Sequence, residues 1–310
     1  MSIPFIIAGF KWRFPFRRAL TYKEIANYRI LNYLEQLDQT MKEPPSSAIK
    51  NDFWQRLSRN RVLLLLLSLI LFLLVWQVLV SVLDLPGFIL PSPAEVSGKF
   101  LDVLGTGLLW RHFSATLGEI LLGLVFGISA ATLLGYALAK SPLAERLLSP
   151  FLVGSQSIPM AAIAPLLVIW FGPGLISKVL ICSLTVFFPV LVNTLVGLRD
   201  VSPELREVMR SLRATPAQTL RYLEIPAALP VFLGGLRVGA SLSVIGAIVG
   251  ELVASDRGLG FLINVGRGQY DTALVFVAVI CLVALAASLY GLVLLLENKV
   301  LSWQTWRKEA

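Results

Sequence analysis

Four ionisable side chains lie inside long apolar segments, and they are the residues whose types most readily suggest chemistry. They are Glu119, Lys178, Arg237 and Glu251. If these segments cross a membrane, each charge is costly there and indicates a functional site by default. We expect Glu119 to face a cavity near the outer end of its segment. Lys178 lies one turn from the end of its segment, so its long side chain is expected to extend to the membrane surface.

Two interpretations stay open for each of the other two charges. Arg237 could extend toward the inner surface or bond to the end of a neighbouring helix. Glu251 could form part of an outer gate or meet a docked protein, or it could pair with Arg257 or Arg267.

The sequence contains few of the residue patterns that enzymes use for catalysis. A single histidine, His112, excludes most arrangements that need paired imidazoles, and the sequence contains no G-x-x-x-x-G-K-[ST] phosphate loop for ATP hydrolysis. Cys182 and Cys281 lie inside apolar runs and are best interpreted as small hydrophobic residues, not as a disulfide or a metal site. We therefore predict no catalytic residue, no metal site and no cofactor.

The composition is that of a membrane protein. The 310 residues are 56% hydrophobic and only 15% charged, with a mean hydropathy of +0.76, whereas soluble domains contain about a quarter charged residues. The net charge of +8 is unevenly placed: eleven Lys and Arg lie in residues 1–61 and five in residues 199–228, but only two each in 84–114 and 253–272. This asymmetry follows the positive-inside rule and argues against a nucleic-acid surface.

Six apolar segments are each long enough, at about 22 to 25 residues, to cross a hydrocarbon core of about 30 Å. With the basic N-terminus inside, six crossings place both termini and residues 199–228 in the cytoplasm and residues 84–114 outside. We predict an all-α membrane protein with an N-terminal extension (1–61), a transmembrane domain (62–303) and a cytoplasmic tail (304–310). The segments are Val62–Leu83, Ala115–Ala139, Leu148–Phe171, Leu175–Leu198, Leu229–Leu252 and Thr272–Leu296.

Polar residues interrupt the third segment just before Pro159. Broken backbone at membrane depth is tolerated where it is buried in protein or lines a wet cavity, so this segment is our first candidate for a pore-lining element. Alternatively, its Ser and Gln side chains merely hydrogen-bond to neighbouring helices. The candidates for a translocation path are Glu119, Ser155, Gln156, Ser157, Asn193 and Glu251.

The N-terminal extension lacks the pattern of a secretory signal, because its basic residues follow the apolar run Ile3–Phe10 instead of preceding it. Residues 1–20 suit an anionic membrane surface, and a disordered tail fits them equally well. Residues 21–24 have the form of a capping box, and apolar residues then recur at helical spacing as far as Met41. We expect an amphipathic helix there, lying on the membrane or docked on a partner.

Residues 199–228 form a polar interval between the fourth and fifth segments. Ser202-Pro203 has the form of a helix start, with an N-cap oxygen followed by a proline where no N–H is needed. Thr215-Pro216 restarts the helical pattern, which runs to Ile225-Pro226, where the next apolar segment opens. Two short amphipathic helices meeting at a bend would make a stiff lever presented to a partner. An ordinary solvated loop is the alternative, but it would not need two helical patterns.

This interval resembles the cytoplasmic coupling loop of type I ABC importer permeases, and we call residues 199–228 the coupling segment. Glu207 takes the Glu of the family's Glu-Ala-Ala pattern, and Ile225-Pro226 closes the pattern. Arg213 stands where the family has Gly; that Gly permits a sharp bend, which an Arg is expected to make only in a less compact form. The resemblance assigns ATPase coupling to Glu207, Arg210, Arg213, Ala214, Leu223 and Pro226.

The resemblance extends from about Leu65 to Trp303. Within the family of binding-protein-dependent transport inner membrane components, the chain looks most like the branch importing taurine, aliphatic sulfonates, nitrate or bicarbonate and thiamine-pyrimidine precursors. Members that carry pyrimidine precursors or riboflavin are favoured by two stretches of the sequence, Phe187-Phe188-Pro189 and Gly246–Glu251.

What the resemblance implies is a complete importer. A homodimer of six-span chains would sit among the lipids of a bacterial inner membrane, with two ATPase subunits docked on the coupling segments and an external substrate-binding protein. The mechanism would be alternating access driven by ATP, and the chain itself would not be an enzyme.

Two other classes of function are weighed against this one. A secondary transporter driven by an ion gradient would use Glu119 or Glu251 as its proton or ion site, but such transporters often carry inverted repeats, which we do not find. A structural membrane scaffold organised by the N-terminal helix is the third class. Neighbouring reading frames encoding an ATPase and a binding protein would decide among the three.

Overall fold

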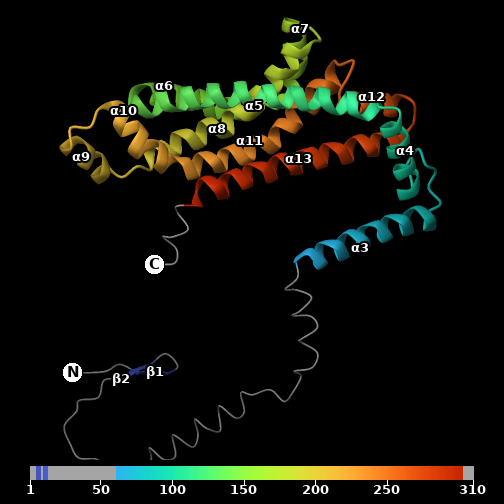
Figure 1. The fold of residues 1–310 in the computed structure, drawn as a ribbon, viewed down its shortest axis with the longest axis horizontal. Coiled ribbons are helices and arrows are strands. Elements are labelled where there is room, and N and C mark those ends of the chain that lie inside the picture. Colours follow the sequence, from blue (N-terminus) through green and yellow to red (C-terminus); the bar gives the residue numbers. More distant parts are fainter. Residues whose placement is uncertain (1–4, 8–9, 13–60, 303–310) are drawn as a thin grey trace, which may run out of the picture. The chain divides into compact units, whose positions relative to one another are not determined.

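The computed structural model describes residues 5–7, 10–12 and 61–302 (Figure 1). The chain divides into two units, Met1–Phe72 and Leu73–Ala310, and each is described by itself. In the first unit, Phe5–Ile7 (β1) pairs antiparallel with Phe10–Trp12 (β2). The capping box at residues 21–24 and the amphipathic helix expected after it lie outside the described residues.

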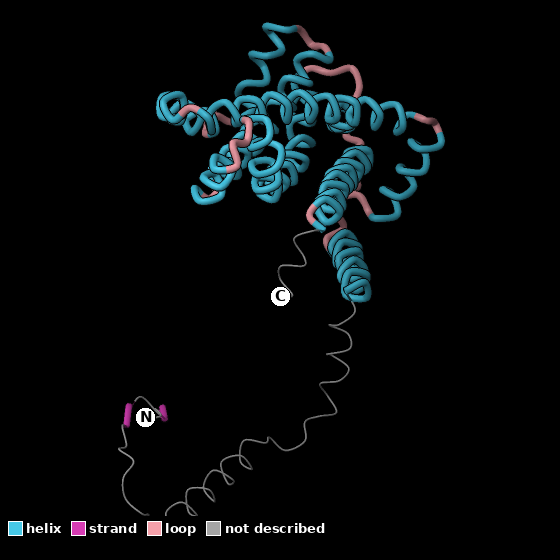
Figure 2. The backbone as a smooth tube through the Cα atoms, turned by 60° about the vertical axis from the view of Figure 1, so that its left-hand side comes forward, coloured by secondary structure: helices cyan, strands magenta, loops and turns pink. Residues whose placement is uncertain are grey.

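The described part of the second unit is helical, with loops confined to connections between helices (Figure 2). Arg61–Val82 (α3) runs from the first unit into the second. The remaining elements are Pro93–Gly105 (α4), Leu108–Lys140 (α5), Pro142–Gln156 (α6), Met160–Phe171 (α7), Leu175–Arg199 (α8), Pro203–Ser211 (α9), Pro216–Thr219 (α10), the π-helical turn Leu220–Glu224 (η1), Ile225–Val253 (α11), Leu259–Gly268 (α12) and Thr272–Val300 (α13).

Five helical stretches are long and apolar enough to cross a membrane: α3, α5, α8, α13 and the run from α10 through α11. The pair α6–α7 passes the same test together but bends by 98°, so six spans result if the pair counts as one. The bend falls at residues 157–159, where the sequence predicted a break, because Pro159 has no N–H to donate and disfavours helical geometry at the residue before it. The predicted all-α membrane fold is confirmed.

Two helices lie between the predicted membrane-crossing segments, in intervals where no helix was predicted from the sequence. The interval 84–114 contains α4, and the interval 253–272 contains α12. A capping box starts α4: the Glu95 N–H donates to Ser92 Oγ at 3.2 Å, and the Ser92 N–H donates to Glu95 Oε2 at 2.9 Å.

The core of the second unit is a close-packed group in which α8 contacts both α5 and α11 (Figure 1). Small residues allow this approach. A Cβ at Gly127 of α5 would lie 2.7 Å from the carbonyl oxygen of Ser183, and a Cβ at Gly246 of α11 would lie 2.9 Å from Cα of Cys182. Small residues on facing helices are the usual means of close backbone packing within a membrane.

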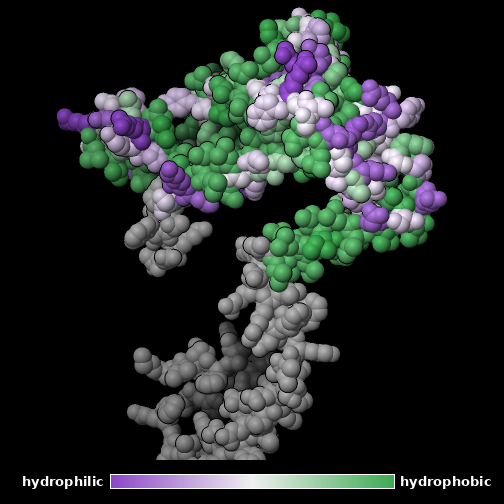
Figure 3. Space-filling model, turned by 45° about the vertical axis from the view of Figure 1, so that its right-hand side comes forward, coloured by the Kyte–Doolittle hydropathy of each residue, from purple (hydrophilic) through white to green (hydrophobic). Residues whose placement is uncertain are grey.

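Hydrophilic side chains gather toward the ends of these helices, and an apolar surface lies between them (Figure 3). The coupling segment lies at one end of α5, α8 and α11, whereas α4 and α12 lie at the other (Figure 1). Large apolar side chains on the outer faces are exposed, among them Val125, Ile245 and Val283. Such a surface is suited to contact with lipid chains.

Candidate functional site

The coupling segment forms the two capped helix starts that its sequence predicts. The hydroxyl of Ser202 accepts from the Leu205 N–H at 3.4 Å at the start of α9. Thr215 and Gln218 form a reciprocal capping box at the start of α10, with bonds of 2.8 and 3.3 Å. These side chains satisfy N–H groups that have no partner within the helix.

The bend between the two helices is made at Arg213, which has a φ of 51°. From the sequence, an Arg was expected to make this bend only in a less compact form, yet Arg213 adopts the left-handed conformation that a Gly would use. Its N–H donates to the carbonyl of Arg210 at 2.9 Å, and the Ala214 N–H donates to that of Met209 at 3.0 Å. These two N–H groups donate to carbonyls in the last turn of α9, and the bonds offset the roughly 1–2 kcal/mol that a left-handed residue costs.

The second helix of the coupling segment does not end at Ile225-Pro226, as the sequence suggested. It continues through the π turn η1 into α11, so that one helical run extends from Pro216 to Val253. Pro226 lacks an N–H, and the wider π turn, in which the Ile225 N–H bonds to the carbonyl of Leu220, precedes it directly. Leu223 and Pro226 are half-buried within this run.

The face that α9 presents is both apolar and charged. Leu205, Val208 and Leu212 are exposed at helical spacing, and Glu207 and Arg210 are exposed beside them. Among the described residues no ion pair involves Glu207, so its carboxylate is available to a partner.

A cavity of about 510 Å³ lies between the α6–α7 bend, α8 and α11. Its lining is mostly apolar but includes two amide and two hydroxyl side chains, and we call it the amide-lined cavity. It brings together Ser155, Gln156 and Asn193, three of the residues predicted for a translocation path. Ser157, the C-cap residue of α6, is not among its lining residues. The lining residues are Ser155, Gln156, Ile158, Pro159, Met160, Leu184, Thr185, Phe188, Pro189, Val192, Asn193 and Leu242.

The orientation of Asn193 within this cavity is fixed by its neighbours. Its amide nitrogen donates to the carbonyl of Pro189 at 2.8 Å, which leaves the side-chain oxygen as an acceptor for another group. Gly235 of α11 makes room for it, because a Cβ there would lie 2.5 Å from Cβ of Asn193.

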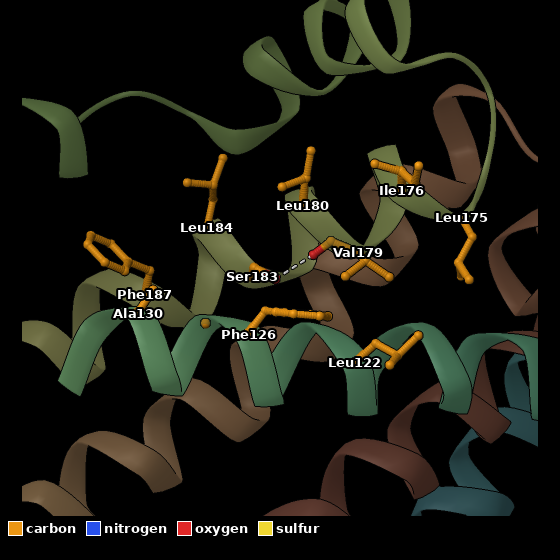
Figure 4. Close-up of a pocket in the computed structure, with 11 residues that line it drawn as sticks. Leu122, Phe126, Ala130, Leu175, Ile176, Val179, Leu180, Ser183, Leu184 and Phe187 are labelled. Carbon is orange, nitrogen blue, oxygen red and sulfur yellow. Dashed lines mark hydrogen bonds between the residues drawn. The ribbon is translucent and has the colours of Figure 1, made fainter. Parts of the chain in front are cut away.

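A second hollow, between α5 and α8, is of the opposite character (Figure 4). This apolar groove of about 610 Å³ is lined mainly by Leu, Ile, Val and Phe side chains. Its one hydroxyl, that of Ser183, is bonded at 2.7 Å to the carbonyl of Val179. The groove therefore offers little to a polar solute.

A buried polar cluster lies near the end of the helices opposite the coupling segment, and it consists of Thr116, Glu119, Lys178 and Glu251. Lys178 is 3% exposed, forms an ion pair with Glu119, and donates to the hydroxyl of Ser255 at 3.0 Å. The expectation that Lys178 extends to the membrane surface is wrong, because a buried carboxylate of α5 pairs with it instead. A paired charge avoids most of the cost of burial.

Glu251 is fully buried and pairs with neither Arg257 nor Arg267 among the described contacts. Its carboxylate accepts from Thr116 Oγ1 at 2.6 Å and from the Gly260 N–H. The structure thus places Glu119 and Glu251 in this cluster rather than along the amide-lined cavity, and their part in a translocation path stays a prediction.

Arg237 resolves its two alternatives in favour of a neighbouring helix. It forms an ion pair with Glu297 near the end of α13, and its guanidinium lies 5.6 Å from the ring centroid of Tyr290.

Two ion pairs at the coupling-segment end were not anticipated from the sequence. Lys140 pairs with Glu224, and Arg199 pairs with Glu145. Glu224 carried a visible signal, since it is a lone acidic residue directly before the apolar run of α11, and Lys140 similarly ends the apolar run of α5.

These features define a class of protein: a helical membrane protein that exposes a polar segment at one end of its spans and holds the amide-lined cavity among them. The chain belongs to the family of binding-protein-dependent transport system inner membrane components, whose model matches residues 123–302. It is a multi-pass inner-membrane permease subunit of an ABC transporter, a class that works with ATPase and substrate-binding partners. The matched residues include the coupling segment and the amide-lined cavity.

The chain is similar to permease proteins of several named transport systems. The riboflavin transport system permease protein RibX of Chloroflexus aurantiacus is 47% identical over 237 residues, which cover 76% of this chain and 88% of the relative. The formylaminopyrimidine transport permease protein ThiX of Halalkalibacterium halodurans is 35% identical over 238 residues (77% and 94%). The taurine transport system permease protein TauC of Escherichia coli is 32% identical over 256 residues (81% and 93%). The family resemblance is confirmed, and these relatives give no support to an ion-coupled secondary transporter.

Proposed function

We propose that this chain forms the membrane path of an ATP-driven importer for a planar nitrogen heterocycle of the riboflavin or pyrimidine-precursor kind. Two copies of the chain form the path, two separate ATPase subunits bind the coupling segments and hydrolyse ATP, and an external binding protein delivers the solute. Both termini and the coupling segment lie in the cytoplasm. The observation that carries the choice of solute is the composition of the amide-lined cavity.

That cavity combines amide and hydroxyl groups with an aromatic ring and contains no charged side chain among its lining residues. A sulfonate, nitrate or bicarbonate anion is best bound by Arg or Lys, and of the groups that bind anions the cavity has only the N-terminus of α7 at Met160. A flavin or pyrimidine instead offers ring faces for Phe188 and polar ring atoms for the amides of Gln156 and Asn193. The 47% identity to a riboflavin permease supports the same choice.

The unbroken helix from α10 through α11 supports a mechanism of alternating access. ATP-driven closure of the ATPase pair draws the two coupling segments together, and α11 carries this movement to the cavity wall, opening the cavity outward. The loaded binding protein delivers its solute there, and ATP hydrolysis resets the cavity inward.

Uptake into proteoliposomes tests this function. The vesicles contain this chain with its ATPase and receive the solute-loaded binding protein, with riboflavin and taurine in separate assays, each with and without ATP. We expect ATP-dependent uptake of riboflavin and none of taurine. Gradient-driven uptake by the chain alone would contradict the importer, and ATP-dependent uptake of taurine without riboflavin would contradict the proposed solute.

The role of the cavity is tested by Gln156→Leu, which removes a polar group without touching the coupling segment. Uptake should fall several-fold while association with the ATPase is retained. Gln77→Leu in α3 is the matched control, because Gln77 does not line the cavity and instead bonds to Ser81. Equal uptake by both variants would reduce Gln156 to a packing residue.

The role of the coupling segment is tested by Glu207→Ala. This variant should remain inserted and dimeric but bind the ATPase poorly and lose uptake, because an exposed carboxylate that pairs with a basic group of the partner has been removed. Glu204→Ala, an equally exposed change on the same helix, should retain association. Transport that persists in Glu207→Ala without nucleotide would favour a secondary transporter.

Cysteine labelling in intact cells tests the proposed sidedness. Ser97→Cys in α4 should react with an impermeant reagent from outside, and Ala217→Cys in α10 only after the membrane is opened; both positions are exposed. The native Cys182 and Cys281 are buried and contribute little background. Labelling of Ala217→Cys from outside would invert the topology.

A further inference from the structure

An ion pair joins the coupling segment to the neighbouring span α5, with the Glu224 carboxylate buried and the Lys140 side chain 44% exposed. Glu224 is 2% exposed, and both of its carboxylate oxygens accept from Nζ of Lys140, at 2.6 and 2.8 Å. Removing the cation would leave a buried charge without a partner, which is strongly unfavourable. The contact between these two residues is therefore held firmly.

Lys140 is fixed on the α5 side of this contact. It is the last residue of α5, and its ammonium group also lies 5.3 Å from the ring centroid of Tyr136, one turn earlier on the same helix. The next helix, α6, begins at Pro142 after a single capping residue, Ser141. A force on Lys140 therefore acts on α5 itself and not on a loop.

Glu224 is equally fixed on the side of the coupling segment. It is the last residue of the π turn η1, within the unbroken helical run from Pro216 to Val253. A displacement of α10 reaches Glu224 without crossing a hinge.

A second contact ties α5 to α11 at the opposite end, where Thr116 donates to Glu251 at 2.6 Å. Thr116 precedes Lys140 by 24 residues, which is about 36 Å along a helix. With a contact at each end, α5 cannot slide or tilt against α11 unless one of the two contacts breaks.

We propose that the Lys140–Glu224 pair makes α5 move together with the coupling segment, so that a movement of the ATPase reaches α5 as well as α11. This inference rests on the proposed function. Lys140 and Glu224 act as positioning residues, because they line neither of the two cavities and lie on helices that the movement must pass through.

Spin labels on the complex of this chain with its ATPase test the inference. Ala137→Cys in α5 and Ala227→Cys in α11 are both exposed positions for the labels. With the pair intact, the distance between the labels should be the same with and without ATP. In the double variant Lys140→Met/Glu224→Gln, which leaves no buried charge unpaired, ATP should change that distance, and riboflavin uptake per ATP hydrolysed should fall by a factor of about ten or more.

Two further variants distinguish a loss of coupling between α5 and the coupling segment from a general loss of folding. Lys140→Arg keeps the cation and should restore both the constant distance and the uptake. Lys99→Met breaks the ion pair with Asp271 at the other end of the molecule and should change neither.

Two results would overturn this inference but not the proposed function. One is a distance between the spin labels that ATP does not change in the double variant. The other is a distance that ATP changes when the Lys140–Glu224 pair is intact. A complex with the pair intact that takes up no solute with ATP would overturn the proposed function, and this inference with it.

Discussion

Thr116 Oγ1 donates a 2.6 Å hydrogen bond to Oε1 of Glu251, although 135 residues separate the two in the chain. The same hydroxyl oxygen accepts from the Leu259 N–H at 2.8 Å, and the other carboxylate oxygen of Glu251 accepts from the Gly260 N–H. One hydroxyl and one carboxylate thus hold the first turn of α12 against α5 and α11. Thr116 and Glu251 are both buried, so their polar atoms depend on these hydrogen bonds in place of water.

Thr116→Val should lower the free energy of unfolding by about 1–3 kcal/mol, because it leaves the Leu259 N–H and one oxygen of Glu251 buried without partners. Thr132→Val on the same helix is the control. The Thr132 hydroxyl is buried and has no hydrogen-bond partner among the described residues, so its removal should be neutral or stabilising. Denaturation of the purified protein in detergent measures both variants, and equal losses would contradict the assigned bond.

Lys178→Met should lower the free energy of unfolding by about 3–5 kcal/mol, because it leaves Glu119 buried without a partner for its charge. Adding Glu119→Gln to the same chain removes the unpaired charge and should recover most of the lost stability. The comparison of the two single variants with the double variant gives the coupling energy of the pair. If the losses of stability in the two single variants add up to the loss in the double variant, Lys178 and Glu119 do not stabilise each other.

Close packing between α5 and α8 predicts a strong difference between two glycines of α5. Gly127→Leu places a side chain against the Ser183 carbonyl, where even a Cβ would lie 2.7 Å away, and should lower stability by about 1–3 kcal/mol. Gly118→Ala meets no atom within 4 Å and should be neutral or stabilising, because Ala favours a helix over Gly by about 1 kcal/mol. The melting temperature and the fraction of monodisperse protein report both changes.

Local patterns in the sequence predicted much of this fold. The helix starts at Ser202 and Thr215 and the interruption before Pro159 depend on residues a few positions apart, so the sequence alone contains them. The helix α4 was also within reach, since Ser92-Pro93 followed by Glu95 is a capping box. It was not predicted, because the interval 84–114 was considered only for its charge and its side of the membrane.

Contacts between distant segments were not predictable in the same way. Lys178 was expected at the membrane surface, because its pairing with Glu119 depends on how α5 and α8 are aligned, and one sequence does not contain that alignment. The continuity of the coupling segment with α11 was missed for a related reason. Pro226 normally marks a helix start, and only the preceding π turn allows the helix to run through it.

The last prediction concerns the bend in the coupling segment, where Arg213 holds a φ of 51°. Arg213→Gly should stabilise the segment modestly. It removes a left-handed strain of roughly 1–2 kcal/mol, of which the greater freedom of Gly in the unfolded chain cancels about 0.4–1 kcal/mol. Arg210→Gly removes the same charge three residues earlier but places Gly inside α9, so it should destabilise the segment by about 1 kcal/mol.

Hydrogen exchange at the backbone amides of residues 203–219 measures the two variants side by side. Protection should rise in Arg213→Gly and fall in Arg210→Gly. Both variants lose one positive charge, so the comparison of their protection is made at equal net charge. A fall in protection in both variants would mean that the Arg213 side chain contributes more to the segment than its backbone strain costs.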